Sequence, residues 1–108
     1  MEDFTMLEMQ EMQKALQDKY KHKWEPIGVE TGKNKLLWMI GEVGEVIDIV
    51  KKYGDEKAST DPELRGRLIE EMADVLMYYN DVMLCYGIDV DELKNVYEKK
   101  FETNMKRW

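Results

Sequence analysis

The chain has 108 residues, which suits a single domain with a modest hydrophobic core. It contains 16 Lys and Arg against 23 Asp and Glu, so its net charge is −7. This acidic balance argues against nucleic-acid binding, because a protein that contacts the phosphate backbone needs a basic surface. We therefore expect one domain over residues 1–108 with no nucleic-acid partner.

The cysteine count and the hydropathy pattern indicate the cellular compartment. Cys85 is the only cysteine, so no disulfide can form within one chain, and this fits a reducing environment. No stretch approaches the roughly 20 apolar residues of a membrane span. The first residues are acidic and amphipathic, unlike a basic signal peptide. We expect a cytoplasmic protein with no membrane partner.

Apolar residues recur at helical spacing, and no segment shows the sustained alternation of a strand. The expected helices run from about Asp3 to Lys23, from about Lys33 to Tyr53, from Thr60 to about Tyr86, and from the residue after Asp89 onward. Residues 24–31 form a predicted loop and residues 55–61 a predicted polar link. Thr60 and Glu63 have capping-box spacing, with Pro62 in the first turn. The predicted fold class is all-α, a bundle of four helices.

Two carboxylates occupy unexpected positions on the second predicted helix. On a helical wheel, Glu42 falls inside the apolar arc, between Val46 and Ile49, and Glu45 lies at its edge beside Trp38. A carboxylate on a core-facing stripe is costly unless something compensates its charge. Glu42 and Glu45 are three residues apart, so they point the same way and repel.

The third predicted helix repeats this arrangement. Glu71 and Asp74 share one face at the same spacing, while Glu70 and Asp81 lie further round and read as ordinary solvated charges. Two facing helices with two carboxylates each would surround a cation with hard oxygen ligands, which suits Mg²⁺ or Mn²⁺. The pattern alone leaves two interpretations open, a metal site or an acidic face in contact with water.

Other kinds of site lack the necessary residues. A di-iron bundle needs Glu-x-x-His on two helices, and zinc sites need His or Cys ligands. His22 is the only histidine, and it stands outside any such motif. No glycine pattern of a phosphate-binding loop is present, and Gly41 and Gly44 more plausibly allow close helix approach.

The ordered pairs Glu42-x-x-Glu45 and Glu71-x-x-Asp74 resemble the ExxE and ExxD motifs of the MazG-like, all-α nucleotide pyrophosphohydrolases. The resemblance covers roughly residues 33–108. It includes a closing K-x-x-x-N-x-x-R-aromatic pattern and an asparagine that matches the deoxycytidine triphosphatase branch, made here by Lys100, Asn104, Arg107 and Trp108, and by Asn34. It implies a four-helix bundle protomer that associates through its helices into a homodimer or a dimer of dimers.

The resemblance implies a reaction. Family members hydrolyse nucleoside triphosphates to the monophosphate and pyrophosphate, and this chain would do so with Mg²⁺, or Mn²⁺ as a substitute, in nucleotide-pool house-cleaning. Glu42, Glu45, Glu71 and Asp74 would be the metal ligands, and Glu42 or Glu45 would also orient or deprotonate the attacking water.

The resemblance also implies residues that contact the substrate. Lys100 and Arg107 would contact phosphate oxygens, and Asn104 would hold a phosphate or the local geometry. Candidates near the base or sugar are Asn34, Trp38, Tyr78, His22, Trp24 and Asn80, although packing accounts equally well for several of these. Base and sugar preference stay open.

Two alternatives compete with an enzyme. One is a non-catalytic helical module that senses a nucleotide or docks a partner, favoured by the nine methionines. The other is a purely structural bundle whose acidic faces are solvated.

Overall fold

The computed structural model describes residues 3–107, which are helical without any strand. The elements are α1 (Met6–Lys19), a 3₁₀ turn η1 (Val29–Thr31), α2 (Gly32–Tyr53), α3 (Asp55–Thr60), α4 (Pro62–Cys85) and α5 (Val90–Arg107). The predicted all-α fold is confirmed. None of the helices in this described part combines the length and apolarity needed to cross a bilayer.

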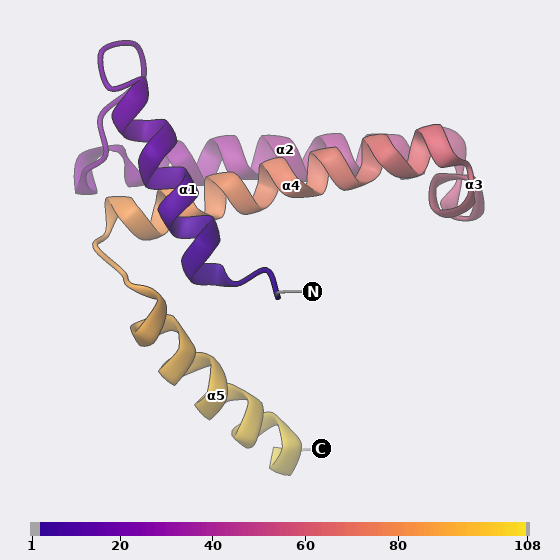
Figure 1. The fold of residues 1–108 in the computed structure, drawn as a ribbon. Helices are drawn as coiled ribbons and strands as arrows, with labels where there is room; N and C mark the ends of the chain where they lie inside the picture. Colours follow the sequence, from indigo (N-terminus) through magenta and orange to yellow (C-terminus); the bar gives the residue numbers. More distant parts are fainter. Residues whose placement is uncertain (1–2, 108) are drawn as a thin grey trace.

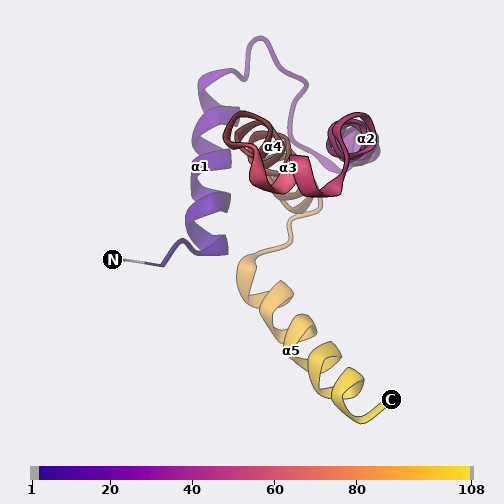
Figure 2. The same ribbon diagram turned by 90° about the vertical axis from the view of Figure 1, so that its right-hand side faces the viewer.

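The long helices α2 and α4 form the central pair and run antiparallel, side by side (Figure 1). The short helix α3 connects them at one end, and α1 crosses α4 near the other end (Figures 1 and 2). At that end Tyr86 packs directly over Gly32, where an added Cβ would lie 2.4 Å from the ring. The site described below lies between α2 and α4.

The ends of α1 follow capping chemistry. The Oγ1 of Thr5 accepts a hydrogen bond from the Glu8 N–H, and Glu8 Oε1 accepts one from the Thr5 N–H, both at 3.1 Å. The helix ends at Lys19, four residues earlier than expected. The chain then turns, and Tyr20 and Trp24 stack with ring centroids 4.7 Å apart.

The predicted polar link over residues 55–61 is wrong, because most of it forms α3. Ala58 anchors this helix, being 1 % exposed against α4. The expected capping box at Thr60 is wrong for the same reason. Thr60 ends α3 and donates to the Glu56 carbonyl, while Asp61 caps α4 by accepting from the Leu64 N–H at 3.0 Å.

Helix α5 stands apart from the other long helices (Figures 1 and 2). Of the described elements only α1 comes close to its backbone, and none of its residues is buried. Its apolar side chains Val96, Tyr97, Phe101 and Met105 are all more than half exposed. A single copy therefore leaves an apolar helix face open to water.

Candidate metal centre

Three of the predicted carboxylates meet between α2 and α4. One oxygen each of Glu42, Glu45 and Glu71 lies within 4.8 Å of the other two. Glu42 and Glu71 are half-buried, and Glu45 is exposed. The antiparallel pairing of the two helices brings together charges that are distant in the sequence.

Two oxygens of this group have no hydrogen-bond partner among residues 3–107. Glu42 Oε2 and Glu71 Oε2 are buried and accept no hydrogen bond from the described residues. A buried carboxylate oxygen without a donor is costly, and a directly bound cation removes that cost. Three carboxylates without nitrogen or sulfur ligands fit Mg²⁺ or Mn²⁺.

The electrostatics of the group agree with its geometry. The adjacent Glu45 carboxylate, followed by burial and the contact with Glu42, raises the pKa of Glu71 to about 7. Burial first, and then the charges of Glu45 and Asp74, also raises the pKa of Glu42, against the lowering effect of its contact with Glu71. Glu71 therefore keeps a proton to higher pH than an ordinary glutamate unless a cation neutralises the group.

Asp74 lies one turn beyond Glu71 on α4, outside the group of three. Its charge nevertheless acts on Glu42, so it lies beside the group. It also lines a neighbouring pocket of about 440 Å³ with Trp38 and Tyr78. Asp74 is thus placed between the carboxylates and this pocket.

The same pocket contains several of the predicted nucleoside contacts. Trp24, Trp38 and Tyr78 line it, and burial raises the pKa of the Tyr78 hydroxyl, with Glu42 adding to the shift. Asn34 is exposed and reaches the pocket indirectly, because its Nδ2 donates at 3.0 Å to Glu25, which lines the wall. His22 is exposed and is not among the residues of this wall.

A basic pair that the sequence reasoning missed lies on the opposite side of the carboxylates. Lys52 and Arg67 line a pocket of about 200 Å³ together with Glu45 and Glu71. Their charged groups lie over the Tyr53 ring, at 5.3 and 5.8 Å from its centroid. Arg67 precedes Glu71 by four residues, so helical spacing would have placed it on the same face.

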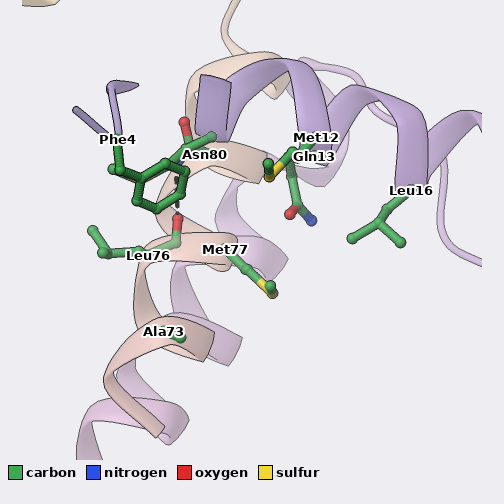
Figure 3. A pocket seen from close by; sticks show the side chains of 9 residues that line it. Phe4, Met12, Gln13, Leu16, Ala73, Leu76, Met77 and Asn80 are labelled. Atoms are coloured by element: carbon green, nitrogen blue, oxygen red, sulfur yellow. Dashed lines mark hydrogen bonds between the residues drawn. The ribbon is translucent and has the colours of Figure 1, made fainter. Parts of the chain in front are cut away.

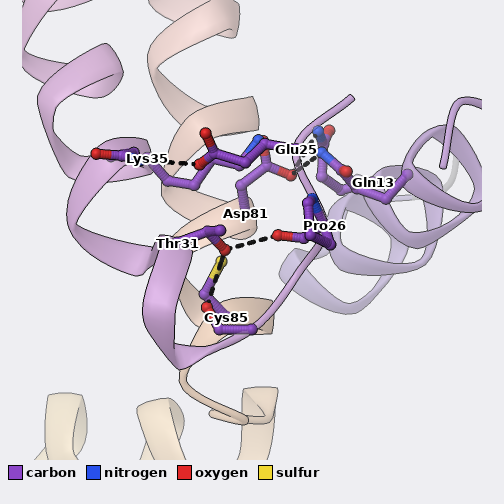
Figure 4. Close-up of polar contacts among 10 residues, drawn as sticks. Gln13, Glu25, Pro26, Thr31, Lys35, Asp81 and Cys85 are labelled. Carbon is purple, nitrogen blue, oxygen red and sulfur yellow. Dashed lines mark hydrogen bonds and ion pairs between the residues drawn. The ribbon is translucent and has the colours of Figure 1, made fainter. Parts of the chain in front are cut away.

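The expectation that Asp81 is a solvated charge is wrong. It is 2 % exposed, and its Oδ1 accepts hydrogen bonds from Gln13 and Gln17, each at 2.9 Å (Figure 4). Lys35, itself buried, lies 4.0 Å from Oδ2. Burial raises the pKa of Asp81, while the two amides and Lys35 oppose that rise. Gln10, Gln13 and Gln17 share one face of α1, which is the sequence signal for this network.

Asn80 is buried, but its side-chain amide is only partly hydrogen-bonded. Its Nδ2 donates to the Leu76 carbonyl at 2.9 Å, and its Oδ1 has no partner among the described residues. It borders a small apolar pocket of about 110 Å³ between α1 and α4, with Phe4 and Met77 (Figure 3). This pocket does not include the three glutamates.

The tail residues are not brought to the carboxylates by their own chain. Lys100, Asn104 and Arg107 lie on α5, whose backbone comes close only to α1 among the described elements. Trp108, the last residue of the tail pattern, lies outside the described residues. Gly41 and Gly44 also depart from expectation, because a Cβ at either position would meet nothing within 4 Å in this chain.

Comparison with known families agrees with this geometry. The family model described as the MazG nucleotide pyrophosphohydrolase domain matches residues 30–107. That span contains the three glutamates, the whole pocket beside Lys52 and Arg67, about half of the residues lining the pocket beside Trp38 and Tyr78, and α5. No curated protein and no solved structure gives a significant match to the chain.

Proposed function

This chain belongs to the MazG nucleotide pyrophosphohydrolase domain family, and on that premise we propose that it hydrolyses nucleoside triphosphates to the monophosphate and pyrophosphate. The observation that carries the proposal is the pair of buried carboxylate oxygens without partners, on Glu42 and Glu71, beside Glu45. Nucleotide-pool house-cleaning is the role we propose for this reaction.

The three glutamates would hold Mg²⁺, with Asp74 as the fourth ligand and Mn²⁺ as a possible substitute. The bound metal would lower the pKa of a coordinated water and offset charge at the α-phosphorus. Glu42 or Glu45 would orient or deprotonate that water, since both face the group from α2. The metal also explains how an acidic site accepts a polyphosphate.

The two pockets beside the carboxylates support one orientation of the bound nucleotide. We infer that the nucleoside occupies the pocket lined by Trp38 and Tyr78, where ring stacking is available. The β- and γ-phosphates would then extend toward Lys52 and Arg67 on the other side. In this arrangement the α-phosphate would lie beside the three glutamates, where attack by water releases pyrophosphate.

We propose that a second copy of the chain completes the site. The apolar face of α5 is exposed, and so are large apolar side chains before α1 and on α1, α2 and α4, including Phe4, Leu7, Ile40, Ile47, Ile69 and Met72. A homodimer or a dimer of dimers would bury such faces. The partner's α5 would then supply Lys100, Asn104 and Arg107 to the phosphates.

The test is pyrophosphate release from canonical and modified triphosphates in the presence of Mg²⁺. Glu42→Gln should abolish release, because it removes a ligand charge while keeping the side-chain size. Glu70→Gln is the matched control, since Glu70 is an exposed carboxylate next to Glu71 on α4 and should leave release intact. Release that survives Glu42→Gln, or that is absent across the whole panel, would contradict the proposal. Tight nucleotide binding without turnover would instead favour a sensing module.

A further inference from the structure

A buried ion pair forms part of the wall of the proposed nucleoside pocket. Lys35 is 7 % exposed and Asp81 is 2 % exposed, and both line this pocket. Buried charges are rare unless they are paired, and a pair of this kind is a poor source of stability compared with apolar side chains. The pair is therefore better explained by what it offers to a ligand.

The contacts of Asp81 leave Lys35 as the group that faces a ligand. Asp81 Oδ1 already accepts two hydrogen bonds, from Gln13 and Gln17 of α1. Lys35 Nζ has one ion pair and no hydrogen bond among the described residues, and its 4.0 Å approach to Asp81 Oδ2 is longer than a hydrogen bond. An ammonium carries three N–H donors and no acceptor, so this part of the wall presents donors to the pocket.

Helix geometry gives the distance of Lys35 from the carboxylates. Lys35, Trp38 and Glu42 are spaced by three and four residues, so they share one face of α2. Seven residues separate Lys35 from Glu42, which is about 10 Å along the helix axis. A nucleotide spans a similar distance from its α-phosphate to the far edge of its base. A base beside Trp38 would therefore direct that edge toward Lys35.

We propose that Lys35, positioned by Asp81, selects nucleotides whose base carries a carbonyl oxygen at that edge. A carbonyl accepts a hydrogen bond from the ammonium, whereas an exocyclic amino group would place N–H groups against N–H groups and leave both unpaired. The preferred substrates are then uracil over cytosine nucleotides, and hypoxanthine over adenine nucleotides. This inference rests on the proposed function for the identity of the ligand class.

Binding of non-hydrolysable α,β-methylene triphosphates, measured by calorimetry with Mg²⁺, tests this selection directly. The uracil analogue should bind about tenfold or more tightly than the cytosine analogue, and the hypoxanthine analogue likewise against adenine. Lys35→Met should reduce each ratio to within about twofold, because the donor is lost. Lys33→Met, which removes a charge from an exposed position on the same helix, should keep both ratios.

Two further variants separate recognition from folding. The double variant Lys35→Met with Asp81→Leu leaves no unpaired buried charge, and it should show the same loss of selectivity. Asp81→Asn keeps the ammonium but weakens its positioning, so both ratios should fall. A merely structural role for the pair would instead lower the affinity for both members of each pair equally.

The outcomes also separate this inference from the proposed reaction. Equal affinities in the unmodified protein, a preference for the amino bases, no binding of any analogue, or ratios that survive both Lys35 variants would each overturn the inference. Pyrophosphate release without these ratios would overturn it while the proposed function stands. The expected ratios without any pyrophosphate release would uphold it as a property of a nucleotide-binding site and contradict hydrolysis.

Discussion

Protonation of Glu71 links the candidate metal site to stability. Its pKa is raised from an ordinary value of 4.5 to about 7, so the folded state binds a proton more tightly than the unfolded chain. The stability that this proton contributes is fully present below about pH 4.5 and is lost as pH rises through about 7. Metal-free protein should therefore unfold at lower urea concentration at about pH 8 than at about pH 6.

Mg²⁺ should remove this dependence, because the cation takes the place of the proton. Stabilisation by Mg²⁺ should consequently be larger at about pH 8 than at about pH 6, and Glu71→Gln should abolish the difference. Urea titrations with and without Mg²⁺ measure both effects. Equal stabilisation at the two pH values would show that these carboxylates do not bind the ion.

Residue patterns predicted the carboxylates better than the groups around them. Glu42 was conspicuous because a charge on an apolar arc needs compensation, and Glu45 and Glu71 indeed lie beside it. Asp81 and Lys35 were missed because each looks like an ordinary surface charge on its own helix. Their burial depends on α1 crossing α4, a tertiary arrangement that helical periodicity does not encode.

At the scale of the helices, the start of α4 allows a test of which residue caps it. Asp61 accepts a hydrogen bond from the Leu64 N–H, whereas Thr60 Oγ1 donates within α3. Asp61→Ala should lower the free energy of unfolding by about 1 kcal/mol, because an orphan N–H loses its partner. Thr60→Ala is the control and should cost clearly less. Urea unfolding of both variants measures these losses. A larger loss for Thr60→Ala than for Asp61→Ala would support Thr60 as the cap, as predicted from the sequence.

The start and end of α2 were largely predictable, and short elements were not. The helix ends at Tyr53, as expected, and Gly54 follows it with a φ of 88°, which favours glycine. Helix α3 was not predicted because six residues are too few to show a periodic pattern, and because its polar composition resembles a linker. Its position is fixed by burial of Ala58 against α4, which requires the α2–α4 pair to exist first.

At the scale of the whole molecule, the position of α5 raises the question of whether its residues serve their own chain or a second copy. Its residues fall within the span that the family model matches, but they lie away from the carboxylates of their own chain. An exposed apolar helix face is typical of an interface rather than of an isolated monomer. Sedimentation should therefore show an oligomer. Phe101→Glu places a charge on this face and should shift the protein toward the monomer.

Mixing two inactive variants tests whether the site is shared between copies. Glu42→Gln removes a proposed metal ligand, and Lys100→Ala removes a proposed phosphate contact on α5. If the partner supplies α5, a mixed dimer contains one site with both defects and one site with neither. Random exchange makes about half of the dimers mixed, so about a quarter of normal pyrophosphate release should return.

If α5 instead served its own chain, every site would carry one defect and the mixture would stay inactive. Recovery after subunit exchange would thus assign the tail to the neighbouring copy, with each single variant incubated alone as the control.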